Sequence, residues 1–298
     1  MTGPSRFPAL VALTLALSAC GDPPRDAVTE VSARTPSLSA SDAGTPLRQY
    51  GSAVRVGNGE ARAYIEYDRA GERGSPIEIG MSFDAKSLDG LSAPTTESRK
   101  GGHLGHSMLN EFLLPLPKRN PTPYRLLALN WNPAGHEPPG IYDIPHFDFH
   151  FYVISLDERN AIEPSDPLFQ AKADHLPAPE YVAPGFLNLP PPPAPASAVP
   201  MMGVHFSDLS SPELQPPSSP NHTTFTRTFI YGSWDGNVIF EEPMITVDYL
   251  RTKPDGVFPI AMAQRYTPAG YYPSAYRVTY DAKRSEYRIG LSNLVWRS

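Results

Sequence analysis

One short segment of the chain places two imidazoles and a carboxylate at alternate positions. The segment runs from Pro145 to Tyr152 and reads PHFDFHFY. In an extended strand, successive side chains point to opposite faces. One face would then carry the phenylalanines of a core, and the other would carry His146, Asp148 and His150. Groups of this kind on a single face predict a metal site or a proton-transfer site.

Strand geometry limits which of these side chains can share a metal. Positions two apart on a strand are separated by ~6.6 Å and positions four apart by ~13 Å, at ~3.3 Å per residue. His146 and His150 therefore cannot meet at one ion unless the strand bends. We expect one of them, with Asp148 as a ligand or as an orienting partner, to be joined by His136 and His205 from other segments.

Two plainer interpretations stay open for the same residues. The polar face could be solvated, or its histidines could be buried and hydrogen-bonded to Asp148 for structure only. His103 and His106 also have the spacing of metal ligands, but their glycine-rich surroundings favour an ordinary loop. If a metal is held by imidazole and carboxylate groups, zinc or copper(II) fits better than a metal that prefers thiolate.

The chain lacks the motifs of several enzyme classes. It has no G-x-S-x-G elbow, no G-x-x-x-x-G-K-[ST] phosphate loop and no H-E-x-x-H pair. Glu241 and Glu242 are adjacent, so on a strand they would point to opposite faces and would not form a glycosidase pair. The net charge of −6 and the lack of a basic, aromatic-rich patch predict that nucleic acid is not a partner.

The N-terminus predicts export and a lipid anchor. Arg6 precedes an apolar run over residues 10–17 that is too short to span a bilayer. Residues 17–20 read LSAC and resemble a bacterial lipobox, in which Cys20 would be lipidated after cleavage. An ordinary secretory signal with a chance cysteine is the alternative. We expect a location in the cell envelope, on the periplasmic or extracellular face, with the membrane reached through the lipid.

Composition then divides the chain into parts. Residues 1–19 are the expected signal peptide, and residues 20–48, rich in Ser, Thr, Ala, Asp and Pro, are the expected disordered tether. Residues 49–298 are expected to form one β-rich domain, with a proline-rich strap at about 189–200. Since Cys20 is the only cysteine, no disulfide can stabilise this domain.

The expected fold is mainly β, an antiparallel sandwich or a barrel-like domain with long proline-rich loops and little helix. The chain has 36 prolines, 15 tyrosines and 13 phenylalanines, which favour short strands joined by ordered loops. One short helix is expected within residues 166–175. Strands are expected at 61–67, 77–83, 124–131, 146–152, 223–231, 238–240, 244–250, 276–280 and 286–291. Residues 112–117 are expected to form an edge strand or a loop, because their prolines cannot donate to a ladder.

Several sequence blocks resemble an uncharacterised family of secreted bacterial proteins, classed as a domain of unknown function, with one member from a Thermus species. The blocks are residues 130–139, 145–152, 202–205, 231–236 and 270–273. The resemblance covers about residues 50–298 and implies a β-rich fold, self-association and no assigned activity. The family histidines that carry over are His136, His146, His150 and His205.

Three functions are compatible with these features. The first is an envelope-anchored metal-binding protein for metal binding or a stress response. The second is a metal-assisted hydrolase, in which an open coordination position activates water and Glu137 or Asp148 handles the proton. The third is a non-catalytic structural module that associates into a homo-oligomer. Whether the protein is an enzyme is left open by the sequence.

Overall fold

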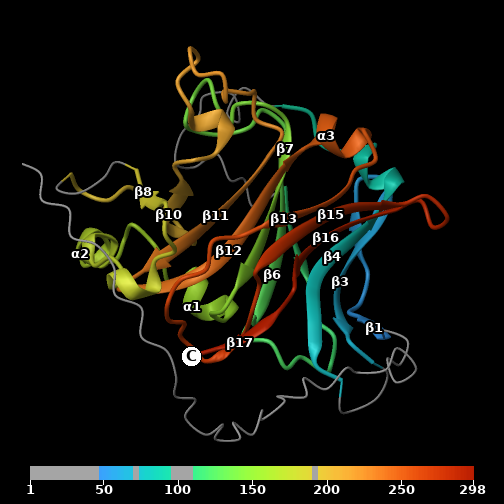
Figure 1. Ribbon diagram of the computed structural model, residues 1–298, viewed down its shortest axis with the longest axis horizontal. Coiled ribbons are helices and arrows are strands. Elements are labelled where there is room, and N and C mark those ends of the chain that lie inside the picture. Colours follow the sequence, from blue (N-terminus) through green and yellow to red (C-terminus); the bar gives the residue numbers. More distant parts are fainter. Residues whose placement is uncertain (1–46, 70–73, 95–109, 190–193) are drawn as a thin grey trace, which may run out of the picture. The chain divides into compact units, whose positions relative to one another are not determined.

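The computed structural model describes most of the chain after the expected tether (Figure 1). The described residues are 47–69, 74–94, 110–189 and 194–298. They belong to one unit that extends from Ala43 to Ser298. The expected signal peptide, Cys20, His103 and His106 lie outside the described residues, as do positions 190–193 of the expected strap. Across the described ranges, no helix has the length and apolar character needed to cross a bilayer.

The first antiparallel sheet combines N-terminal and C-terminal strands. Its strands are β1 (Leu47–Tyr50), β2 (Val54–Val56), β3 (Gly59–Tyr67), β4 (Pro76–Asp84), β13 (Asp255–Pro259), β15 (Ala275–Asp281) and β16 (Glu286–Ser292). Their order is β1-β3-β4-β16-β15-β13, and β2 pairs with β3. The strands expected at 276–280 and 286–291 are present as β15 and β16, which pair with each other. Strand β1 begins within the last two residues of the expected tether.

The second antiparallel sheet carries the two-faced strand. Its strands are β5 (Glu111–Leu114), β6 (Leu126–Asn132), β7 (His146–Tyr152), β8 (Phe186–Asn188), β9 (Ala198–Val199), β10 (Gly203–Asp208), β11 (Arg227–Trp234) and β12 (Asn237–Thr246). Their order is β5-β6-β7-β12-β11-β10-β8, and β9 pairs with β10. Strand β5 lies at the edge, as its following prolines predict. A separate ribbon pairs β14 (Gly270–Tyr272) with β17 (Val295–Arg297).

Helices are short in the described chain. They are α1 (Leu156–Asn160), α2 (Phe169–Asp174), α3 (Val247–Arg251) and the 3-10 turns η1 (Ala85–Leu88), η4 (Pro179–Tyr181) and η5 (Pro212–Leu214). Helix α2 lies inside the segment where a helix was expected. The strand expected over residues 244–250 is wrong in its second half, where α3 begins. The reason is a cap: the Thr246 side chain accepts a hydrogen bond from the backbone N–H of Tyr249, which starts the helix.

The two larger sheets pack against each other through aromatic rings. Phe83 of β4 lies 5.9 Å from Phe147 and 6.2 Å from Phe149 of β7, measured between ring centroids. Neither sheet closes on itself within the described residues, so the fold is a sandwich and not a barrel. The mainly β prediction, with little helix, is confirmed. Full burial of a phenylalanine contributes about 1.5–3 kcal/mol, so a one-residue slip of β7 would cost several such contributions.

Candidate metal centres

The face of β7 that points away from the other sheet is fully buried. Phe147, Phe149 and Phe151 fill the space between the sheets, so alternation directs His146, Asp148 and His150 to the opposite face. All three polar side chains have an exposed fraction of 0%. The interpretation of this face as solvated is therefore wrong.

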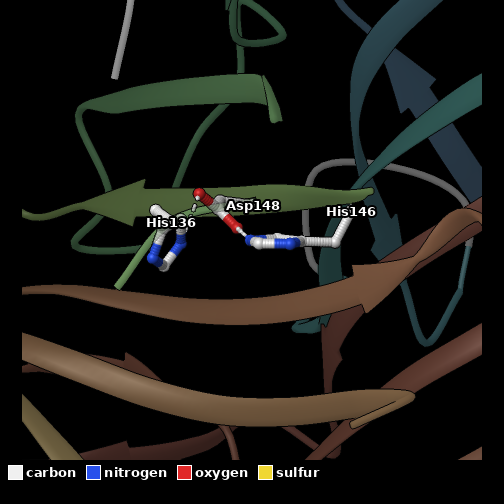
Figure 2. A group of neighbouring side chains, drawn as sticks. All are labelled: His136, His146 and Asp148. Atoms are coloured by element: carbon white, nitrogen blue, oxygen red, sulfur yellow. Dashed lines mark ion pairs between the residues drawn. The ribbon is translucent and has the colours of Figure 1, made fainter. Parts of the chain in front are cut away.

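His136, His146 and Asp148 form a first group, here called the Asp148 cluster (Figure 2). The carboxylate of Asp148 lies between the two imidazoles. Its Oδ1 atom is 3.1 Å from Nε2 of His146, and its Oδ2 atom is 3.6 Å from Nε2 of His136. Asn132, on the neighbouring strand β6, donates a 2.6 Å hydrogen bond to Oδ2 and orients the carboxylate.

The loop between β6 and β7 brings His136 to this cluster. Gly135 turns the chain with a φ of 69°, in the left-handed region that favours glycine. A Cβ at this position would lie 2.1 Å from the carbonyl oxygen of Tyr142, so no side chain fits. The N–H of His136 donates to the same Tyr142 carbonyl at 3.1 Å, which closes the loop. The position of His136 thus depends on a turn that requires glycine.

His150, His205 and Glu242 form a second group, here called the Glu242 cluster. They come from β7, β10 and β12. The Oε2 atom of Glu242 is 3.2 Å from Nε2 of His150 and 3.9 Å from Nε2 of His205. Glu241 is paired with Phe151 and shares its core-facing side, so Glu242 must point to the side of His150.

A glycine on β11 allows the Glu242 cluster to pack closely. Gly232 lies opposite both His205 and Phe240 in the two strand pairs of β11. A Cβ there would lie 2.1 Å from the Phe240 ring, so this ring occupies the space of the missing side chain. The Phe240 ring is 5.0 Å from the His150 ring and 5.4 Å from the His205 ring. The two imidazoles therefore share one aromatic wall.

Hydrogen bonds at Nδ1 determine which nitrogen of three histidines faces each cluster. Nδ1 of His136 lies 2.7 Å from the carbonyl oxygen of Glu137, and Nδ1 of His146 lies 2.6 Å from that of Ile144. Nδ1 of His150 lies 3.1 Å from Oδ1 of Asn130. These oxygens can only accept, so Nδ1 carries the proton and Nε2 of a neutral ring has a lone pair. Metal-bound histidines are usually held in this way.

The contact between His150 and Glu242 has no ordinary hydrogen bond. Nε2 of His150 and Oε2 of Glu242 are both buried, and neither has a hydrogen-bonding partner in the described structure. They nevertheless lie 3.2 Å apart. In a tetrahedral zinc site with bonds of ~2.0–2.1 Å, neighbouring ligand atoms are ~3.3 Å apart. The spacing therefore matches two ligands directed at a common ion.

The two clusters differ in charge. Burial acts to lower the pKa of His136, but the hydrogen bond and charge of Asp148 raise it to about 9. Burial acts to raise the pKa of Asp148, but His146 and His136 hold it well below its usual range. In the Glu242 cluster, burial lowers the pKa of His150 to about 4. The Asp148 cluster thus pairs a carboxylate with an imidazolium, whereas His150 is neutral at physiological pH.

Burial also sets the protonation of the other two groups in the Glu242 cluster. It lowers the pKa of His205 to about 3, with a smaller contribution from the nearby His150. It raises the pKa of Glu242 well above its usual range, and the charge of Asp148 adds to this effect. These shifts favour the uncharged form of each group in this cluster. A cation would displace the proton of Glu242.

One cavity connects the two clusters. It has a volume of about 220 Å³, and His136 from the first cluster and His205 from the second both line it. Glu137 and Ser207 also line it, with apolar walls that include Met244. Residues from both clusters can therefore reach the same small molecule.

The structure brings together all five sequence-predicted ligands on one face of one sheet, but in two groups and not one. His146 and His150 are in different clusters, as their spacing on a strand requires. His175 instead contacts Asp235, at a distance of 2.8 Å between Nδ1 and Oδ1, with both side chains largely exposed.

Sequence reasoning missed Glu242 as a ligand, and it missed two supporting amides. It correctly separated the faces of Glu241 and Glu242, but gave no reason to assign either one to the histidines. The available signal was the position of this acidic pair inside an otherwise apolar strand, β12. Asn130 and Asn132 alternate on β6 beside β7 and were likewise not singled out.

Comparisons with protein-family models, with curated proteins and with solved structures found no match. The resemblance to a family of secreted bacterial proteins therefore stays a prediction from the sequence blocks.

Proposed function

We propose that the protein is a metal-binding protein of the cell envelope and that each cluster holds one divalent transition-metal ion. The observation that carries this proposal is the buried contact between Nε2 of His150 and Oε2 of Glu242, which is 3.2 Å long and lacks hydrogen-bond geometry. An imidazole lone pair and a carboxylate oxygen repel each other in the dry interior unless a proton or a cation lies between them.

The ligand types favour zinc or copper(II). Each cluster offers two imidazole nitrogens and one carboxylate. These ligands are intermediate between hard and soft, and none is a thiolate. Three protein ligands leave at least one coordination position for water or another small ligand. The lipid anchor expected at Cys20 would hold the domain at a membrane surface, where it would bind metal outside the cytoplasm.

Metal-assisted hydrolysis is a second candidate, favoured by the cavity of about 220 Å³. Open coordination positions facing a cavity are typical of catalytic sites and not of structural ones. Glu137 lines this cavity beside His136 and is the described carboxylate best placed to move a proton there. The described residues that line it include no lysine or arginine, so a small uncharged ester fits better than a phosphate ester.

Elemental analysis of the full chain, produced without a histidine tag, tests the metal proposal. We expect about two equivalents of metal per chain, one for each cluster. His146→Ala and His150→Ala should each lose about one equivalent, because they belong to different clusters. His175→Ala, at an exposed histidine, is the matched control and should keep both. A parent protein that binds no zinc or copper, or unchanged content in both variants, would contradict the proposal.

Turnover of 4-nitrophenyl acetate by the metal-loaded protein separates the two candidates. A hydrolase should show activity that a chelator abolishes and that Glu137→Gln lowers while metal content stays the same. Activity at the level of the free metal ion would leave metal binding as the function.

A further inference from the structure

A second cavity lies on the opposite side of β12 from the Glu242 cluster. It has a volume of about 330 Å³ and is lined by residues from β11, β12, β14 and the segment 260–267. Glu241 enters it, because adjacent residues on a strand point to opposite faces. The two neighbouring glutamates of β12 therefore point to opposite sides of the sheet, and Glu241 is the one that lines this cavity.

Glu241 is a carboxylate without a cationic partner. The hydroxyl of Tyr124 donates a short hydrogen bond to its Oε2 atom. Among the described residues, no lysine, arginine or histidine lies within ion-pair distance of Glu241, and no second hydrogen bond reaches it. A carboxylate withdrawn from water in this way is stabilised by a cation brought to it. Its other oxygen is available to a molecule in the cavity.

Several of the side chains around Glu241 are aromatic. Tyr181, Phe229, Tyr231, Tyr266 and Tyr272 all line the cavity. The rings of Tyr266 and Tyr272 are 4.2 Å apart between centroids. The face of an aromatic ring carries negative charge density, and several rings that line one cavity can form a cage that attracts ammonium groups.

Backbone hydrogen bonds hold three of these rings in place. The hydroxyl of Tyr231 accepts from the N–H of Ala183 at 3.2 Å. The hydroxyl of Tyr266 accepts from the N–H of Ala263 at 3.1 Å, and that of Tyr272 donates to the carbonyl of Pro268 at 2.6 Å. A cage fixed before binding loses little conformational entropy when a ligand enters.

We propose that this cavity binds a small organic cation, a primary or methylated ammonium group on a short apolar body. The ammonium group would lie against Glu241 and the aromatic rings that line the cavity. Arg265 also lines the cavity, but its side chain is exposed and makes no ion pair with Glu241, so water screens its charge. The proposal is independent of metal at the two clusters on the other face of the sheet.

Calorimetric titration of the full chain with choline tests the proposal, with 3,3-dimethylbutan-1-ol as the uncharged molecule of the same shape. A chelator in the buffer keeps the metal clusters out of the measurement. Choline should bind with one-to-one stoichiometry, at least about tenfold more tightly than the alcohol, as expected for a desolvated cation–π site with a carboxylate. Equal affinities, or no saturable binding of choline, would overturn the proposal.

Adjacent glutamates provide the matched variants. Glu241→Gln should weaken choline binding at least about tenfold and leave metal content unchanged, since a lost charge contact of ~1.4 kcal/mol or more has that effect. Glu242→Gln should lower the metal content and leave the affinity for choline unchanged. Tyr266→Leu, a change in a partly exposed loop, removes one wall of the cage and should also weaken choline binding. If Glu241→Gln misfolds, Tyr266→Leu decides: unchanged choline affinity in this variant would reject the cage.

Discussion

The hydrogen bond on Nδ1 determines what each imidazole can do. His150 shows this most clearly, because Asn130 presents its Oδ1 atom to the ring while its Nδ2 atom donates to Glu111. The amide is therefore held in one orientation, and the histidine tautomer follows from it. The alternative of purely structural histidines requires the protonated carboxyl of Glu242 to donate to His150, whereas the 3.2 Å contact has no hydrogen-bond geometry.

Removal of this amide should act on one cluster only. We expect Asn130→Ala to lower the metal affinity of the Glu242 cluster by about 10- to 100-fold, the usual effect of losing a partner that orients a ligand. Asn132→Ala is the matched variant and should weaken the Asp148 cluster instead, because Asn132 holds the carboxylate there. Competition with a chromophoric chelator measures both affinities. Equal effects of the two variants on both sites would contradict the assignment.

His150 also predicts acid sensitivity of the metal-free protein. Its pKa is about 4 in the folded protein and ~6.5 in an unfolded chain, so between these values the unfolded state binds more protons. The free energy of unfolding should therefore fall as the pH falls from about 6.5 to about 4, by about 3 kcal/mol for this group at ~1.4 kcal/mol per pH unit.

Urea denaturation with a chelator present, at several pH values in this range, measures the effect. His150→Gln should show a smaller loss of stability than the parent over the same range. His175→Gln, at an exposed histidine, should keep the parent's dependence on pH. The prediction fails if the His150 and His175 variants respond alike.

The shape of the loop between β6 and β7 depends on the turn at Gly135. Two of its glycines, Gly135 and Gly140, have positive φ values of 69° and 81°. A Cβ on Gly135 would meet backbone atoms at 2.1 Å, whereas a Cβ on Gly140 would have nothing within 4 Å. Both substitutions strain the backbone, but only the first displaces the loop that holds His136.

Gly135→Ala should therefore lose metal from the Asp148 cluster and retain it at the Glu242 cluster. Gly140→Ala is its control and should cost only about 1–2 kcal/mol of stability with both metals kept, the cost of a left-handed conformation for alanine. Elemental analysis and thermal denaturation of the two variants make the comparison. Loss of metal from Gly140→Ala, or full metal content in Gly135→Ala, would show that the turn does not position His136.

In the whole molecule, β7 and β12 each divide their side chains between the two faces of one sheet. Strand β7 supplies phenylalanines to the space between the sheets and ligands to the opposite face, and β12 directs its two glutamates in the same divided way. The cost of burying the polar groups of both clusters must be offset by the sandwich core or by metal. Metal bound as proposed would make the stability of the fold depend on that metal.

Chelation should consequently lower the melting temperature. An ion at one hundred times its dissociation constant adds about 2.7 kcal/mol to the native state. For a domain of this size, each kcal/mol corresponds to about 2–4 °C, so we expect a shift of about 5–10 °C for each cluster. Differential scanning calorimetry with zinc and with a chelator measures it. His150→Ala should lose part of the shift, and an identical melting temperature in both conditions would contradict metal binding.

Local pattern in the sequence was sufficient for much of the fold. The alternation of PHFDFHFY predicted both faces of β7, and the prolines after β5 predicted an edge strand. The strand rise predicted that His146 and His150 could not share an ion. A capping box was also readable at Ser155 and Glu158, where helix α1 begins, although no helix was predicted there. Each of these features depends on residues close together in the chain.

The pairing of distant strands could only come from the tertiary structure. Glu242 lies 92 positions after His150 in the chain, and it becomes a partner because β12 lies beside β7 in one register. A shift of β12 by one residue relative to β7 would place Glu241 beside His150 instead. The sequence by itself determined which residue types could bind a metal and which of them share a strand face. The register between strands, set by the packing of the whole aromatic core, decided that these residues form two clusters and which carboxylate belongs to each one.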